Sequence, residues 1–104
     1  MINNEKKELD ELVAAKELKE RAVDQFYEDL ENTIKNDEQT AQKYGLTGIN
    51  AVSPEFVSLD YMREWEGRKK IVLRFIVTDS NDKKLCGYYV YYTVDGNYVY
   101  SFFN

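Results

Sequence analysis

Tyrosine is the side chain whose number and spacing most clearly indicate a function for this chain. Six of the nine tyrosines lie in one segment near the C-terminus, GYYVYYTVDGNYVYSFF (residues 87–103). Tyrosine combines a large apolar ring with a hydroxyl that needs water or a hydrogen-bond partner. The segment therefore predicts a hydrophobic core, an exposed binding surface, or one of each on the two faces of a sheet.

The residues that most enzymes use for acid–base, nucleophilic or metal chemistry are scarce. The chain has no histidine and one cysteine, Cys86, which lies in an apolar segment and is interpreted as a small buried hydrophobe. The glycines are scattered and form no phosphate-binding loop. Asp60 and Glu64 share one face of an alternating segment, where carboxylates are usually solvated. We therefore predict no catalytic residues, no metal site and no cofactor.

The net charge of −5 is confined to the first part of the chain. Residues 1–44 carry 12 acidic and 7 basic side chains, and residues 45–104 carry 7 of each. This distribution argues against nucleic-acid binding through a basic surface. The acidic part fits a solvated helix face or a surface that docks on a basic protein. No apolar run approaches the ~20 residues of a membrane-spanning helix, so no membrane span is predicted.

Two helices are predicted ahead of the tyrosine-rich segment. Residues 1–44 lack proline and glycine, and their apolar side chains recur every three or four positions, which predicts an amphipathic helix over about 5–35. A helix of ~30 residues spans ~45 Å, so it is expected to overhang a sheet of ~33 Å strands at its N-terminal end. Asp37 as N-cap and Gly45 after the last turn predict a short helix over about 37–44. One unbroken helix through Tyr44 is the alternative.

The rest of the chain predicts β structure. Alternating segments indicate four strands at about 56–65, 70–79, 84–94 and 97–103, with Pro54 starting the first element after a connector. In the first strand, Val57, Leu59 and Tyr61 are predicted to share a face. The chain is thus interpreted as one α+β domain over 1–104 with an antiparallel four-stranded meander. Its order of elements resembles cystatin-like and nuclear-transport-factor-like folds, which implies a scaffold or a binder.

The dipeptide Asp95-Gly96 predicts a two-residue hairpin turn between the last two strands. This turn would pair Tyr92 with Val99 and Thr93 with Tyr98. One face would then carry Leu85 with the five residues of a candidate protein-binding surface: Tyr89, Tyr91, Tyr98, Tyr100 and Phe102. The opposite face, which includes Val90, looks more like ordinary core and is expected to pack on the long helix. Aromatic pairs across strands also stabilise a sheet without a partner, so that interpretation stays open.

These features predict a small non-catalytic protein-binding module that uses the aromatic sheet face and the acidic helix. It would bind a protein partner or form a homodimer through the sheet. The bias toward Asn, Lys, Tyr, Glu and Ile is typical of AT-rich genomes and favours one form of this hypothesis, a phage or mobile-element inhibitor of a host protein.

Two alternatives stay open. One is an extracytoplasmic domain of a Gram-positive lipoprotein or membrane-anchored protein whose anchor was removed before Met1, with the overhanging helix as its stalk. The other is a small-ligand binder or enzyme with a tyrosine-lined pocket between helix and sheet. The compartment is left open, with the cytoplasm favoured unless an anchor precedes Met1.

Overall fold

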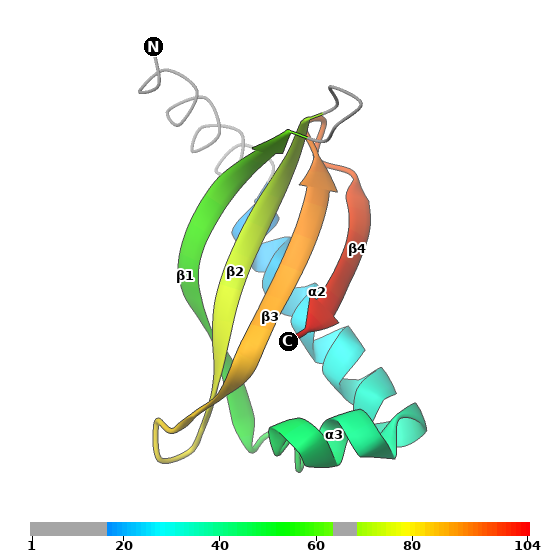
Figure 1. Ribbon diagram of the computed structural model, residues 1–104, viewed down its shortest axis with the longest axis vertical. Coiled ribbons are helices and arrows are strands. Elements are labelled where there is room, and N and C mark those ends of the chain that lie inside the picture. The colour runs from blue at the N-terminus through cyan, green and yellow to red at the C-terminus, as the bar shows by residue number, and fades with distance from the viewer. Residues whose placement is uncertain (1–16, 64–68) are drawn as a thin grey trace.

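Two helices precede a four-stranded antiparallel sheet in the computed structural model, which describes residues 17–63 and 69–104 (Figure 1). The elements are α2 (Leu18–Asn36), α3 (Glu38–Tyr44), β1 (Val52–Arg63), β2 (Lys69–Asp79), β3 (Lys84–Thr93) and β4 (Tyr98–Phe103). The strands lie in the order β1-β2-β3-β4, so each pairs with its neighbour in sequence. The predicted α+β class and the predicted meander are confirmed.

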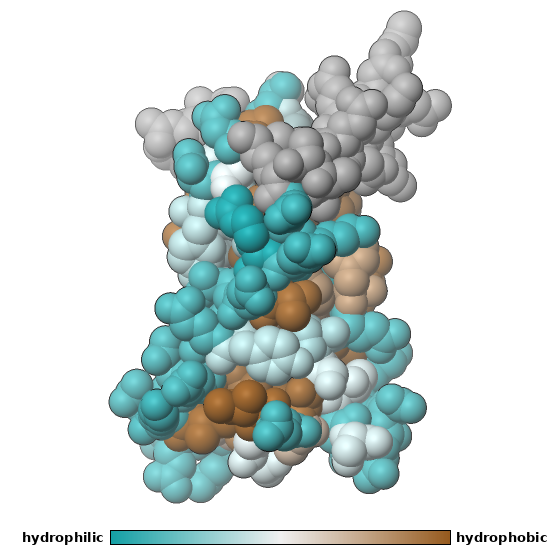
Figure 2. Space-filling model, turned by 180° about the vertical axis from the view of Figure 1, so that it is seen from behind, coloured by the Kyte–Doolittle hydropathy of each residue, from teal (hydrophilic) through white to brown (hydrophobic). Residues whose placement is uncertain are grey.

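Helix α2 crosses one face of the sheet diagonally and supplies part of the core (Figure 1). Leu18, Ala22, Phe26 and Leu30 follow helical spacing and are completely buried. We call the sheet face under α2 the helix side and the opposite face the outer face. Hydrophilic side chains follow the solvent side of α2, and hydrophobic ones show beside it (Figure 2).

The start of α2 differs from the expected long helix. Glu17 has a left-handed backbone conformation (φ 54°), which a right-handed helix cannot contain, so α2 begins at Leu18 instead of continuing an unbroken helix from residue 5. The rest of the predicted helix, residues 5–16, and its predicted overhang lie outside the described residues.

The predicted break between the helices is confirmed, and Asp37 forms it. Its backbone is not helical (φ −137°, ψ 71°), and its carboxylate accepts hydrogen bonds from the Thr40 N–H (3.2 Å) and the Thr40 hydroxyl (2.7 Å). Gly45 ends α3 with φ 71°, and the Leu46 N–H donates to the Ala41 carbonyl at 2.8 Å. The alternative of one unbroken helix through Tyr44 is therefore wrong.

Strand β1 starts earlier than predicted and is interrupted by a bulge. It begins at Val52, and Pro54 lies inside it, because the edge of a sheet tolerates a residue without an N–H. The register shifts between Phe56 and Ser58, which leaves Val57 51% exposed. The prediction that Val57 shares a face with Leu59 and Tyr61 is wrong, because a bulge inserts one residue into the alternation.

Phe56 takes the place predicted for Val57. It pairs with Phe75 of β2, and the two rings make an edge-to-face contact with centroids 5.7 Å apart. Leu59 and Tyr61 follow on the same side and pack against the core. The helix side of β1 is therefore apolar along its length, although α2 leaves Phe56 38% exposed.

The last hairpin keeps most of the predicted register. Tyr91 pairs with Tyr100 and Tyr89 with Phe102, as predicted. A shift after Tyr91 then pairs Tyr92 with Tyr98 instead of Val99. The turn is longer than two residues: the Thr93 N–H donates to the Asn97 carbonyl at 2.8 Å. Tyr98 therefore lies on the helix side, and its predicted place on the outer face is wrong.

A third register shift, between Val77 and Thr78, moves Leu85 out of its predicted place on the outer face. Leu85 packs against the core. Its side chain lies 3.5 Å from the point where a Cβ atom would stand if Gly45 had a side chain. The sheet end and the end of α3 therefore touch at this point.

The core lies between α2 and the helix side of β2 and β3. Tyr88, Val90 and Tyr92 of β3 are at most 1% exposed. The Phe26 ring packs edge-on against Tyr88 and Phe103, with centroids 5.2 Å and 5.9 Å apart. The prediction that the face with Val90 packs on the long helix is confirmed.

Candidate functional site

Four aromatic rings from β3 and β4 form a stacked strip on the outer face, which we call the aromatic strip: Tyr89, Tyr91, Tyr100 and Phe102. Tyr91 and Tyr100 stack with centroids 4.4 Å apart and planes 9° apart. Tyr89 and Phe102 stack at 5.2 Å with parallel planes. Along β4, Tyr100 and Phe102 are 6.0 Å apart and within 12° of parallel. The pleat of two paired strands thus aligns the rings.

The exposed part of the aromatic strip lies along β4. Tyr100 is 44% exposed and Phe102 38%, whereas the neighbouring rings leave Tyr91 only 7% exposed. In the part of the chain that the structure describes, no helix or strand lies on the outer face (Figure 1). The strip is therefore a surface feature. The exposed rings of β4 stack against the less exposed tyrosines of β3, the neighbouring strand of the same sheet.

Two cations of β2 border the aromatic strip. The Arg74 guanidinium lies 5.5 Å from the Tyr89 ring centroid, and the Lys70 ammonium lies 5.7 Å from that of Tyr100. Arg74 also contacts the Asp60 carboxylate, with Nε 3.1 Å from Oδ2. Such cation–π contacts contribute about 0.5–1 kcal/mol at exposed sites. They hold the rings in place and leave a flat apolar surface with polar margins.

The Tyr91 hydroxyl stays protonated at neutral pH. Burial is the main cause that raises its pKa, and the neighbouring Tyr100 raises it further. The centre of the strip is therefore uncharged.

Strand β4 also forms one edge of the sheet. The backbones of Gly87 and Asn104 exchange hydrogen bonds of 2.9 Å and 3.0 Å. Bonded pairs alternate along antiparallel strands, so Phe102 also directs its backbone polar groups toward β3, while Ser101 and Phe103 direct theirs away from it. No described strand pairs with this side of β4. The edge therefore presents N–H and C=O groups next to the exposed rings.

On the helix side of the same edge, Asp29 collects several hydrogen bonds. Its carboxylate accepts from the hydroxyl of buried Tyr88 (2.6 Å), from the Ser101 hydroxyl and from the Gln25 side-chain amide (2.9 Å). The Ser101 hydroxyl is in turn hydrogen-bonded to that of Tyr98 at 2.7 Å. Burial, followed by the bond to Asp29, raises the pKa of Tyr88 strongly. Asp29 thereby fixes β4 to α2.

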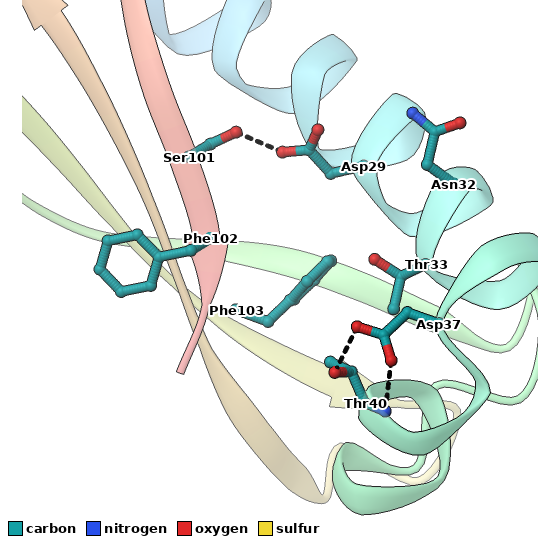
Figure 3. Close-up of a pocket in the computed structure, with 8 residues that line it drawn as sticks. All are labelled: Asp29, Asn32, Thr33, Asp37, Thr40, Ser101, Phe102 and Phe103. Carbon is teal, nitrogen blue, oxygen red and sulfur yellow. Dashed lines mark hydrogen bonds between the residues drawn. The ribbon is translucent and has the colours of Figure 1, made fainter.

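A pocket of about 350 Å³ opens beside Asp29, between α2, α3 and the end of β4 (Figure 3). Its lining combines carboxylates, hydroxyls, an amide and two phenylalanines: Asp29, Asn32, Thr33, Asp37, Thr40, Ser101, Phe102 and Phe103. The ring of Phe103 points toward the helices and that of Phe102 away from them, as the alternation of a strand requires (Figure 3). Among the described residues, no basic side chain and no tyrosine lines this pocket.

The predicted binding residues thus fall into two groups. The structure brings Tyr89, Tyr91, Tyr100 and Phe102 together, and it places Tyr98 on the other face. Sequence reasoning missed Asp29, because nothing local distinguishes it from the other acidic residues of α2. The one available signal is its position beside the apolar stripe, next to Leu30.

Cys86 is a free, half-buried thiol, and burial raises its pKa to about 11. It is therefore protonated and weakly nucleophilic at neutral pH. Within residues 17–63 and 69–104, no three His, Cys, Asp or Glu side chains gather as metal ligands would. Of the helices that the structure describes, none has the length and hydrophobicity to cross a membrane.

No protein-family model, no curated protein and no solved structure matches this chain.

Proposed function

We propose that this protein is a non-catalytic module that binds another protein through the outer face of its sheet. One observation carries the proposal: four stacked rings occupy the outer face, and two of them, Tyr100 and Phe102, are 44% and 38% exposed. An antiparallel sheet with one face in water usually alternates apolar and polar side chains. Contiguous exposed apolar surface of this kind marks interaction sites.

The chemistry of the aromatic strip suits a protein partner. Tyrosine and phenylalanine are enriched at protein interfaces, where large rigid rings bury area with little loss of side-chain entropy. Stacking between strands contributes only about 0.2–1 kcal/mol for each pair, and small β-branched residues would support the sheet equally well. Exposed rings along β4 are therefore better explained by binding than by folding.

The acidic side chains on the solvent side of α2 indicate the charge of the partner. Glu20, Asp24, Glu28 and Glu31 are all exposed, and the whole chain carries a net charge of −5. Basic side chains are exposed on α2 as well, and Lys35 pairs with Glu31 at 2.7 Å, so the helix carries an excess of acidic charge and not one sign alone. Such an excess accelerates association with a basic partner and contributes less to affinity itself. The expected partner is therefore a protein with a basic surface next to an apolar patch.

The test uses two phenylalanines that differ only in their place. Phe102 and Phe56 are both 38% exposed and both lie on edge strands, but Phe102 is on the outer face and Phe56 on the helix side. Threonine suits a strand at either position. In affinity capture from a lysate of the source organism with mass spectrometry, Phe102→Thr should lose a protein that the wild type and Phe56→Thr both retain.

Circular dichroism controls for folding of both variants. The proposal fails if Phe102→Thr is folded and retains the same proteins as the wild type. It also fails if Phe102→Thr unfolds under conditions in which Phe56→Thr stays folded, because the ring would then be part of the core.

A further inference from the structure

We infer that the partner adds an extended strand to the edge of β4, with apolar side chains on the aromatic strip and alternating basic side chains in the acidic pocket. This inference rests on the proposed function and names the partner's chemistry. It joins two features that meet at one strand, the exposed rings on the outer face and the pocket on the helix side.

The outer edge of β4 presents backbone N–H and C=O groups with which an added strand can pair. Ser101 and Phe103 direct their N–H and C=O groups away from β3, as the Gly87–Asn104 pair requires. Proteins usually protect such edges with lysine, proline or a bulge. The other edge, β1, has Pro54 and the bulge at Val57. In β4, the segment Tyr100–Phe103 has none of these, and the bulge at Val99 lies near the other end of the strand.

The outer face determines which side chains the partner strand needs at every second position. Side chains directly opposite each other on paired strands are about 4.5–5.5 Å apart at their Cβ atoms. A strand beside β4 would therefore place every second side chain next to Tyr100 and Phe102. These two rings are the exposed part of the aromatic strip. Apolar or aromatic partner residues would extend the strip by one strand.

The helix side determines which side chains the partner strand needs at the intervening positions. The intervening partner side chains would point into the pocket, where Asp29 and Asp37 supply carboxylates and Phe103 an apolar wall. Hydrogen bonds from the Thr40 side chain and backbone lower the pKa of Asp37, which keeps this carboxylate ionised. A carboxylate has about four acceptor sites, and Asp29 uses three and Asp37 two. Both can still accept from a lysine or arginine whose stem lies on Phe103.

A second copy of this chain fits the edge less well. Antiparallel pairing of β4 with its copy about Ser101 would bring the two Asp29 carboxylates toward each other, because each is bonded to its own Ser101. Like charges in such proximity oppose association. The copied strand, YVYSFF, also contains no basic residue to place in the pocket. The charge therefore favours a different, basic strand.

The experiment is a titration of the whole chain with short synthetic peptides, followed by NMR of the backbone amides. The first probe alternates lysine and valine, the second alternates glutamate and valine, and the third has the composition of the first with the lysines in one block. We expect the first peptide alone to bind and to shift the amides of Ser101 and Phe103 most. Equal binding by the glutamate or the block peptide would overturn the inference.

Two N-methylated forms of the first peptide test the edge without any change to the protein. One form carries methyl groups on the odd residues and the other on the even residues. Only one of the two sets of N–H groups can face β4, so one form should fail to bind and the other should bind like the parent. Equal affinity of both forms would show that no strand is added.

Charge variants test the pocket. Asparagine replaces aspartate as an N-cap, so Asp37→Asn keeps α3 and loses only the charge. Asp29→Asn with Asp37→Asn should weaken binding of the first peptide roughly three- to tenfold, as expected for two partly exposed ion pairs. Glu20→Gln with Glu28→Gln removes the same charge elsewhere on α2 and should have a smaller effect. Equal effects of both pairs, or of Asp37→Asn and Glu28→Gln alone, would contradict the pocket assignment.

The outcomes also separate this inference from the proposed function. Shifts confined to Tyr91 and Tyr100, with no discrimination among the N-methylated forms, would overturn the added strand and leave binding by the outer face intact. No shift with any peptide would also overturn it, while the capture experiment with Phe102→Thr decides the proposed function independently. Concentration-dependent broadening of β4 amides without peptide would show that a second copy occupies the edge.

Discussion

The two faces of the sheet use the same residue types but bury them in different ways. On the helix side, Tyr88 and Tyr92 lie under α2 and are 0% and 1% exposed. On the outer face, Tyr91 is 7% exposed because its neighbours stack on it, and Tyr100 stays 44% exposed. The comparison shows that a tyrosine-rich strand does not by itself specify core or surface. The element that covers it decides.

Polar contacts differ between the two faces in the same way. On the helix side, Asp29 of α2 accepts from the buried Tyr88 hydroxyl, and Arg21 of α2 donates to the Gly96 carbonyl in the hairpin turn at 2.7 Å. These bonds connect the helix to distant parts of the sheet. On the outer face, Arg74 contacts Asp60 with both side chains nearly half exposed. The helix-side contacts should therefore contribute far more to stability.

The strongest test of this comparison removes one tyrosine ring from each face. Tyr88→Ala should lower the free energy of unfolding by about 3–5 kcal/mol, because it leaves a cavity in the core and removes a partner of Asp29. Tyr100→Ala should cost at most about 1 kcal/mol, the scale of one pair across strands. Urea denaturation followed by circular dichroism measures both. Similar losses for the two variants would show that the outer face is also a core.

High pH should separate buried from exposed groups with an intermediate effect. Burial raises the pKa of Cys86 to about 11, and it also raises the pKa values of Tyr88 and Tyr92. A pKa that is higher in the folded state gives stability that is complete below the unfolded pKa and is lost as pH rises through the folded one. Stability should therefore be constant up to about pH 8.5 and fall above it, first through Cys86 and above pH ~10 through the tyrosines.

Two variants assign this loss. Cys86→Ala should remove the decline that begins above pH ~8.5, and Tyr88→Phe should reduce the decline above pH ~10. Tyr100→Phe, which removes one hydroxyl from the outer face, is the control. Free energies of unfolding at each pH measure the effect. A decline that neither Cys86→Ala nor Tyr88→Phe changes would contradict the assignment to these buried groups.

The smallest expected effect concerns the ion pair on the outer face. The Asp60 and Arg74 side chains are 47% and 45% exposed, with Nε 3.1 Å from Oδ2. Asp60→Asn should cost about 0.5 kcal/mol or less, and the difference from the wild type should vanish in about 1 M salt. Denaturation at low and high salt measures it. A loss well above 1 kcal/mol that persists in salt would mean that this face is less solvated than its exposure indicates.

Local signals in the sequence were sufficient for the elements and for most of the aromatic strip. The apolar stripe around Phe26, the cap at Asp37 and the turn at Asp95-Gly96 each act within a few residues, so they predict helix, break and hairpin without knowledge of the rest. The two-residue period of a strand then places Tyr89, Tyr91, Tyr100 and Phe102 on one face. These predictions depend only on neighbours in the chain.

Tertiary structure alone decided where Tyr98 lies, how β1 is aligned and what Asp29 does. The register shifts at Val57 and after Tyr91 each change which side chains face the helix, and no residue type in the sequence predicts these shifts. Asp29 meets Tyr88 and Ser101 across 59 and 72 residues of sequence, a contact that exists only because α2 crosses the sheet at that point. Contacts between segments so far apart depend on how whole elements pack, which the spacing of residues within any one element does not specify.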